Sequence, residues 1–256
     1  MGRQRSGLSN LLHAASVLAV LLAVWQAAKW FFALPNFLLP GPADVAGVIY
    51  HQFPHIAFNA LITIQEMLLG LLAGGLLGIC VAVVLASFPV LDRYLMPVVV
   101  TTQTLPVFAI APILVIWFGL GLGSKIVMAA LIIFFPVASS LYDGLKQTPL
   151  AWLDLGHSWG ASRTQLFRHM RLPAALPALM SGLKVAATLA PIGAVVGEWA
   201  GAAGGLGFVM LQANARTQMD VVFAALIVLA FCAWLLRFAV VKLSDRLTGW
   251  AHHTHG

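Results

Sequence analysis

Residues 67–88 read MLLGLLAGGLLGICVAVVLASF, a run that contains no Asp, Glu, Lys or Arg. A helix needs about 20 predominantly apolar residues to cross the hydrocarbon layer of a bilayer, and this run has that length. It is continuously apolar, whereas a strand of a membrane barrel alternates lipid-facing and lumen-facing residues. The stretch therefore predicts a membrane-spanning helix and an all-α integral membrane protein.

The remainder of the chain has the same character. Hydrophobic residues make up 61% of the 256 residues and charged residues only 9%, whereas soluble domains carry about 25% charged residues. We expect about six transmembrane helices in a single domain, residues 1–256, with the first segment retained as a span rather than cleaved as a signal peptide. The six predicted spans are 11–28, 67–88, 96–118, 126–141, 174–196 and 221–241.

The distribution of positive charge predicts the orientation of these spans. Lys and Arg accumulate in the short loops on the cytoplasmic side of a membrane. Placing both termini in the cytoplasm puts 11 of the 14 basic residues inside and leaves Lys29, Lys125 and Arg216 outside. The net charge of +6 therefore reflects topology, and we expect no nucleic-acid partner. The cytoplasmic set is Arg3, Arg5, Arg93, Lys146, Arg163, Arg168, Arg171, Lys184, Arg237, Lys242 and Arg246.

The longest predicted cytoplasmic connection, residues 142–173, is polar and basic. Leu155, Trp159, Leu166 and Met170 recur at spacings near three and four, which is typical of an amphipathic helix. Because Gly160 interrupts the pattern, we expect a short helix, a glycine break and a second helix that ends at Pro173. The pattern alone also allows a helix that lies on the membrane surface with its basic face on anionic lipid.

A family resemblance is carried by this connection. Asp154-Leu155-Gly156, then Gly160 after three residues, then Met170-Arg171-Leu172-Pro173 after nine more resembles the cytoplasmic EAA loop of the permeases of ATP-binding-cassette (ABC) importers. The family pattern is Glu-Ala-Ala, three residues, Gly, nine residues, Ile-x-Leu-Pro, so the spacing agrees throughout. The identities differ at Asp154, Leu155, Gly156 and Met170.

Other motifs extend the resemblance over residues 38–247. Leu39-Pro40-Gly41-Pro42, Gln103-Thr104-Leu105-Pro106 and the run 117–121, WFGLG, are similar to the nitrate, taurine and sulfonate branch of these permeases. The run 190–199, APIGAVVGEW, followed by GGLG at 204–207, is similar to a subset that transports a thiamine-precursor pyrimidine, hydroxymethylpyrimidine.

The resemblance implies a type I importer, in which two permeases and two cytoplasmic ABC ATPases work with an external substrate-binding protein. The loop would then fit a groove of the ATPase dimer, in the manner of a helix bound in a groove. We expect Leu155, Trp159 and Leu166 to be apolar anchors, with Asp154, Arg163 and Arg168 as a polar rim. Gly156, Gly160, Met170, Leu172 and Pro173 complete the predicted coupling loop.

This chain lacks the Gly-x-x-x-x-Gly-Lys-Ser/Thr pattern that cradles nucleotide phosphates. We therefore expect it to bind no cofactor and to be no enzyme, with ATP and Mg²⁺ held by the partner ATPase. The terminal His252, His253 and His255 are interpreted as part of a tail, and no metal site is expected.

Polar residues inside predicted spans are candidates for the solute pathway, because a polar group at membrane depth needs a partner, a cavity or a function. These candidates are Gln103, Thr104, Pro106 and Glu198. Gln103 could instead make a hydrogen bond between helices, and Glu198 could instead pair with Arg216. Glu66 begins the second span, where we expect its carboxylate to be solvated.

Gly70, Gly74 and Gly78 repeat at intervals of four residues, which lets helix backbones approach closely. They predict packing within the bundle or against a second copy of the permease.

The sequence thus predicts an inner-membrane permease, a homodimer surrounded by lipid, that imports a small polar solute. A pyrimidine is favoured over a sulfonate, taurine or nitrate. An ion-coupled secondary transporter is the alternative.

Overall fold

The computed structural model describes residues 3–104, 106–201 and 203–250, and every regular element in these ranges is a helix. The expected all-α fold is confirmed. The terminal histidines lie outside the described residues. The chain forms two compact units: Met1–Phe58 with Val209–Val228, and Asn59–Phe208 with Leu229–Gly256.

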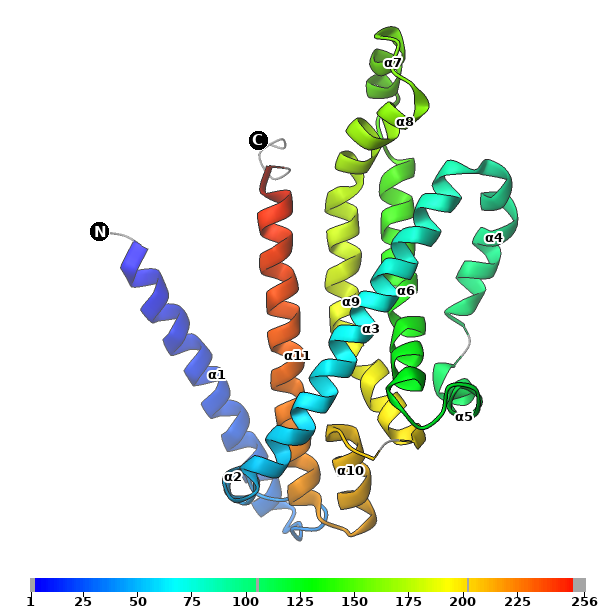
Figure 1. Ribbon diagram of the computed structural model, residues 1–256. Coiled ribbons are helices and arrows are strands. Elements are labelled where there is room, and N and C mark those ends of the chain that lie inside the picture. Colours follow the sequence, from blue (N-terminus) through cyan, green and yellow to red (C-terminus); the bar gives the residue numbers. More distant parts are fainter. Residues whose placement is uncertain (1–2, 105, 202, 251–256) are drawn as a thin grey trace. The chain divides into compact units, whose positions relative to one another are not determined.

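The helices follow one another with short connections (Figure 1). Their bounds are α1 Arg3–Phe31, α2 Pro42–His51, α3 Phe53–Ser87, α4 Pro89–Thr102, α5 Val107–Phe118, α6 Leu122–Lys146, α7 Leu150–Ser158, α8 Arg163–Leu166, the π-helical turn η1 Phe167–Arg171, α9 Leu172–Gly201, α10 Leu206–Ala215 and α11 Met219–Thr248.

Four helical runs within the described ranges are long and apolar enough to cross a membrane: α3, α6, Arg163–Gly201 and α11. The pair α4 and α5 provides a fifth if it forms one bent span. The apolar part of α1, Ala15–Phe31, is shorter than the roughly 20 residues a span needs. The expected number of six spans is thus approximate, and the first span stays a prediction.

The third predicted span, residues 96–118, falls on two helices, α4 and α5. α4 ends at Thr102, α5 begins at Val107, and the two are bent by 98°. Pro106 lies in this break and precedes the first residue of α5. Proline lacks a backbone N–H and its ring clashes with the preceding turn, so it interrupts the helical hydrogen bonds here.

The larger unit is organised around α6, which packs against α3 on one side and α9 on another. A Cβ atom added at Gly74 would lie 2.8 Å from the Ala130 carbonyl oxygen, and one added at Gly182 would lie 2.6 Å from the Pro136 carbonyl oxygen. Glycine is therefore needed where these backbones meet. The prediction of close packing by the glycines of residues 70–78 is confirmed, and their partner is α6.

The smaller unit holds α1 and α2 together by polar contacts. Trp25 Nε1 donates to the Pro40 carbonyl oxygen at 3.0 Å, and Lys29 Nζ donates to Asp44 Oδ2 at 3.0 Å. Asp44 also accepts from the Gly41 N–H. These hydrogen bonds hold the pKa of Asp44 below its usual value of 3.8, because both favour the ionised carboxylate.

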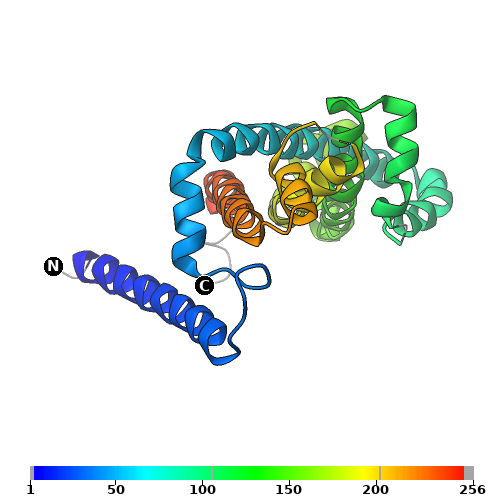
Figure 2. The same ribbon diagram turned by 90° about the horizontal axis from the view of Figure 1, so that it is seen from below.

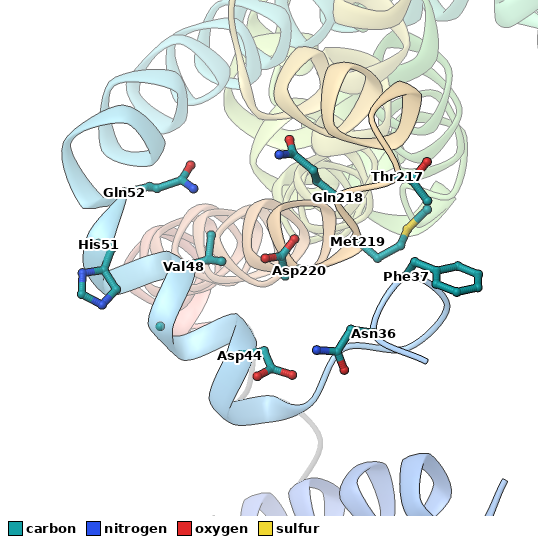
Figure 3. Close-up of a pocket in the computed structure, with 11 residues that line it drawn as sticks. Asn36, Phe37, Asp44, Val48, His51, Gln52, Thr217, Gln218, Met219 and Asp220 are labelled. Carbon is teal, nitrogen blue, oxygen red and sulfur yellow. The ribbon is translucent and has the colours of Figure 1, made fainter. Parts of the chain in front are cut away.

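α2 is a short helix that leads directly into the first residues of α3 (Figure 2). A cavity of about 710 Å³ lies between α2 and residues 217–220 (Figure 3). Asp44 and Asp220 give it an acidic lining.

Candidate functional site

The connection between α6 and α9 folds as two short helices joined at a glycine. α7 ends at Ser158, and Gly160 adopts a φ of +72°. The Gly160 N–H donates to the His157 carbonyl oxygen and the Ala161 N–H to that of Gly156. This pair of bonds is the Schellman motif, which closes a helix at a residue in the left-handed region and favours glycine there.

The second helix begins two residues later with a capping box. Ser162 Oγ accepts from the Gln165 N–H at 3.3 Å, and Gln165 Oε1 accepts from the Ser162 N–H at 2.8 Å. These bonds satisfy backbone donors that a helix leaves free at its start. The predicted short helix and glycine break are therefore confirmed in the structure.

The second helix does not end at Pro173, so that expectation is corrected. α8, η1 and α9 form one run from Arg163 to Gly201. The π-helical turn η1 shifts the hydrogen-bond register just before α9 begins. Pro173 therefore lies in the first turn of α9, where the backbone N–H that proline lacks costs little stability. The knob, defined as α7, α8 and η1 (residues 150–171), is thus continuous with a membrane helix.

Two contacts give the knob its shape. Gly156 is buried, and a Cβ atom there would collide with Leu166 Cδ2 and lie 3.0 Å from Met170 Sδ, so α7 lies against the second helix. The Arg171 guanidinium donates to the Leu145 carbonyl oxygen at 3.0 and 3.3 Å, and this carbonyl at the end of α6 also accepts from the Thr148 hydroxyl. The knob is therefore fastened to α6 as well as to α9.

The knob exposes apolar side chains. Leu155 is 48% exposed and Trp159 is 77% exposed, and Figure 1 shows α7 and α8 projecting beyond the ends of α6 and α9. Asp154, Arg163 and Arg168 are exposed as expected. Exposed apolar side chains grouped on a projecting element are typical of a protein interaction site.

Leu166 is not part of this surface, so its predicted role as an exposed anchor is corrected. It is 5% exposed and packs over Gly156 inside the knob. The periodicity that joined it to Leu155 and Trp159 does not continue through Gly160, because the chain reverses there and the second helix starts a new phase.

A second candidate site is a cavity of about 510 Å³ in the larger unit, lined by α6, α9 and the break between α4 and α5. Gln103 lines it, together with Thr102 from the end of α4 and Val107 from the start of α5. Thr104 and Pro106 lie in the same break, although the cavity does not include them. The Thr104 hydroxyl donates to the Thr101 carbonyl oxygen at 2.8 Å.

Glu198 lies elsewhere, in a buried polar network. It is 1% exposed, its Oε1 accepts from the Thr63 hydroxyl at 2.6 Å, and its Oε2 accepts from the N–H groups of Gly207 and Phe208. Thr63 Oγ1 in turn accepts from the Leu206 N–H at 2.8 Å. The network ties the segment after α9 to α3, and Arg216 is not among these partners.

Glu66 belongs to the same region, and its predicted solvation is corrected. It is fully buried, its Oε1 pairs with Lys125 Nζ at 2.6 Å, and its Oε2 is buried without a hydrogen-bond partner among the described residues. Lys125 is itself buried at the start of α6. Each charge finds its counterion inside the protein, which is the usual condition for burying one.

Residues 74–249 match the family described as the binding-protein-dependent transport system inner membrane component. The chain belongs to this family. The permease is 45% identical, over 93% of its length and 97% of the relative's, to a probable ABC transporter permease protein of Haemophilus influenzae.

Other relatives of the permease carry more specific names. It is 34% identical to the formylaminopyrimidine transport permease protein ThiX of Halalkalibacterium halodurans, over 90% of this chain and 92% of that one. It is 33% identical to the taurine transport system permease protein TauC of Escherichia coli, over 91% and 87%. Its fold resembles a chain of the MetNI methionine ABC transporter in an inward-facing conformation, with a TM-score of 0.68, 21% identity and coverage of 77% and 98%.

Several residues of these sites were missed by sequence reasoning. Trp152 is 50% exposed on α7 and lies three residues before Leu155, so helical spacing alone could have found it. For Arg171, the sequence predicted no more than a positive charge on the cytoplasmic side of the membrane. Nothing local in the sequence of the permease signals that Glu66 and Lys125, 59 positions apart, form a pair.

Proposed function

The chain is a permease subunit of an ABC importer, and we propose that its knob couples the hydrolysis of ATP to solute movement. A cytoplasmic ABC ATPase dimer, which holds ATP and Mg²⁺, would receive Leu155 and Trp159 in an apolar groove. Asp154, Arg163 and Arg168 would form the polar rim of this contact. The permease itself contributes no catalytic residue.

The observation that carries this proposal is the single helical run from Arg163 to Gly201. A closing ATPase would push on the knob, and a continuous helix transmits such a push as a tilt rather than absorbing it in a loop. The bond between Arg171 and the Leu145 carbonyl would make α6 follow. Rigid-body motion of packed helices is a common route from a local event to a global change.

The assembly that we propose contains a second copy of the permease and a substrate-binding protein on the outer side of the bacterial inner membrane, with lipid around the helices. Both termini and the knob then lie in the cytoplasm, as the distribution of Lys and Arg predicts. The binding protein would meet the external segments, which include residues 33–56 and 201–220.

For the transported solute we propose a thiamine-precursor pyrimidine, ahead of a sulfonate, taurine or nitrate. The run 190–199 and the similarity to a formylaminopyrimidine permease support this order. Gln103, Thr104 and Pro106, at the break between α4 and α5, would line the route. Glu198 remains a predicted pathway residue, although its hydrogen bonds favour a role in fixing the segment after α9.

The test is uptake into proteoliposomes that contain the permease, its partner ATPase and the binding protein. We expect uptake of labelled hydroxymethylpyrimidine to require ATP at the ATPase face and to stop when the ATPase is replaced by a variant that binds but does not hydrolyse ATP. Uptake by the permease alone, driven by an ion gradient and indifferent to ATP, would instead establish an ion-coupled secondary transporter.

A further inference from the structure

The cavity at the break between α4 and α5 lies beside the middle of α6, a helix long and apolar enough to cross a membrane. Pro136, one of its lining residues, is close to the centre of α6, Leu122–Lys146, and Val185 and Leu189 of α9 form another wall. Its volume of about 510 Å³ falls in the range of small-molecule sites, about 300–1,000 Å³. Interrupted helices at membrane depth are a frequent location for such sites.

The cavity offers hydrogen-bonding groups that the protein does not use. Within the described part of the chain, the Gln103 amide and the Ser140 hydroxyl have no hydrogen-bond partner. The Ser139 hydroxyl makes only a 3.5 Å contact with the Pro136 carbonyl oxygen, longer than an ordinary hydrogen bond between two oxygens. The Thr102 hydroxyl, by contrast, is occupied by the Val99 carbonyl at 2.6 Å. Gln103, Ser139 and Ser140 are therefore available to a ligand.

The remaining walls are apolar, and one of them is aromatic. Phe135 shares the lining with Leu131, Ile132 and the two residues of α9. An aromatic face beside aliphatic side chains suits a flat ring, since rings stack in offset or edge-on arrangements at little conformational cost. A flexible aliphatic solute would gain less from this surface.

Charge distinguishes a neutral pyrimidine from the charged candidate solutes. The residues that line the cavity include no Asp, Glu, His, Lys or Arg. An anion would lose several kcal/mol of hydration on entering such a site. The start of α5 at Val107 could return about 0.3–1 kcal/mol, up to about 2 kcal/mol in favourable geometry, because a helix N-terminus favours negative charge. The balance favours a neutral molecule.

We propose that this cavity binds a neutral, planar nitrogen heterocycle during transport, with its ring against Phe135 and its polar edge on Gln103 and Ser140. The proposal rests on the import function above and adds a binding site and a chemical class of solute to it. The same site would discriminate against sulfonates, which are charged and tetrahedral.

The experiment measures binding to the purified permease in detergent micelles, without ATPase or binding protein. Equilibrium dialysis would use labelled hydroxymethylpyrimidine and labelled taurine at up to millimolar concentration. Gln103→Leu and Ser140→Ala remove one hydrogen-bonding group each, and Ala keeps the Ser140 Cβ that packs beside Gly182. Ser244→Ala is the matched control, because that hydroxyl is buried on α11 without a partner.

We expect the pyrimidine to bind and taurine not to compete. Each of the two cavity variants should weaken binding about 2- to 12-fold, the loss of one hydrogen bond of about 0.5–1.5 kcal/mol, and Ser244→Ala should bind as the wild type does. Equal competition by taurine, no detectable binding, or cavity variants that bind like the control would each overturn the proposal.

The two proposals fail in different measurements. ATP-driven pyrimidine uptake that is unchanged in Gln103→Leu and Ser140→Ala would leave the import function standing and overturn the binding site. Pyrimidine binding that the cavity variants weaken, in a permease whose uptake ignores ATP, would support the site and overturn ATP-driven import.

Discussion

Replacing Lys125 with methionine should destabilise the permease strongly. Methionine keeps most of the length of the side chain and removes the ammonium group that lies 2.6 Å from Glu66. The side chains of Lys125 and Glu66 are 8% and 0% exposed, so water cannot take over the role of the ammonium.

Breaking a buried ion pair by removing one partner costs about 3–5 kcal/mol, and we expect Lys125→Met to fall in this range. Lys146→Met provides the comparison, because Lys146 makes the same kind of bond to Asp92 at 2.8 Å but its side chain is 44% exposed. An exposed pair contributes about 0.2–1 kcal/mol. The double variant Glu66→Gln with Lys125→Met should recover part of the loss, since no ionised partner then remains at that position.

The assay can use the two cysteines of the chain. Cys232 is buried and Cys80 is exposed, so in a Cys80→Ser background a thiol-reactive dye labels Cys232 when the helices separate. Labelling is followed while SDS is titrated into dodecylmaltoside micelles. The reasoning is refuted if Lys125→Met costs no more than Lys146→Met, or if the double variant is no more stable than Lys125→Met.

Three further changes have definite expected signs. Gly160→Ala should weaken the coupling of uptake to ATP hydrolysis, because a φ of +72° costs a residue with a Cβ about 1–2 kcal/mol, and Gly160→Asn should have a milder effect. An equal ratio of uptake to hydrolysis in the wild type and both variants would contradict this. Gly74→Ala should destabilise the permease by about 1–3 kcal/mol, because the added Cβ clashes with α6, whereas Gly47→Ala on α2 meets open space and should stabilise it by up to about 1 kcal/mol. The same SDS titration shows whether the two variants change stability in opposite directions. The lowered pKa of Asp44 means that its bond to Lys29 stabilises the smaller unit above pH 3.8 and that this contribution is lost as the pH falls through the lowered value. The protection factors of the α2 amides, which correct for the slower intrinsic hydrogen exchange at low pH, should therefore fall on acidification in the wild type and much less in Asp44→Asn.

Features encoded in local sequence were predictable. Continuous apolar runs identify spans because the hydrocarbon layer sets a minimum length, and Gly160 marks a helix end because few other residues tolerate a positive φ. The knob, with its exposed Leu155 and Trp159, follows from these rules together with helical spacing.

Features set by tertiary contacts were not predictable. Glu66 and Lys125 each directly precede a predicted span, 67–88 and 126–141, where a charged side chain commonly reaches the membrane interface, so either residue alone looks solvated. Only the packing of α3 against α6 brings the two together. Pro106 signals an interruption, but the bend of 98° depends on how α5 packs against α6 and α9. Leu166 was misplaced because its helix does not continue the phase of α7.

The most direct test of ATP coupling through the knob compares Leu155→Asp with Leu155→Met in proteoliposomes that contain the permease, its ATPase and the binding protein. Both variants should insert and fold, because Leu155 is 48% exposed on the projecting knob. We predict that binding-protein-stimulated ATP hydrolysis and solute uptake are both lost in Leu155→Asp and both retained in Leu155→Met. Normal hydrolysis and normal uptake in Leu155→Asp would contradict the account.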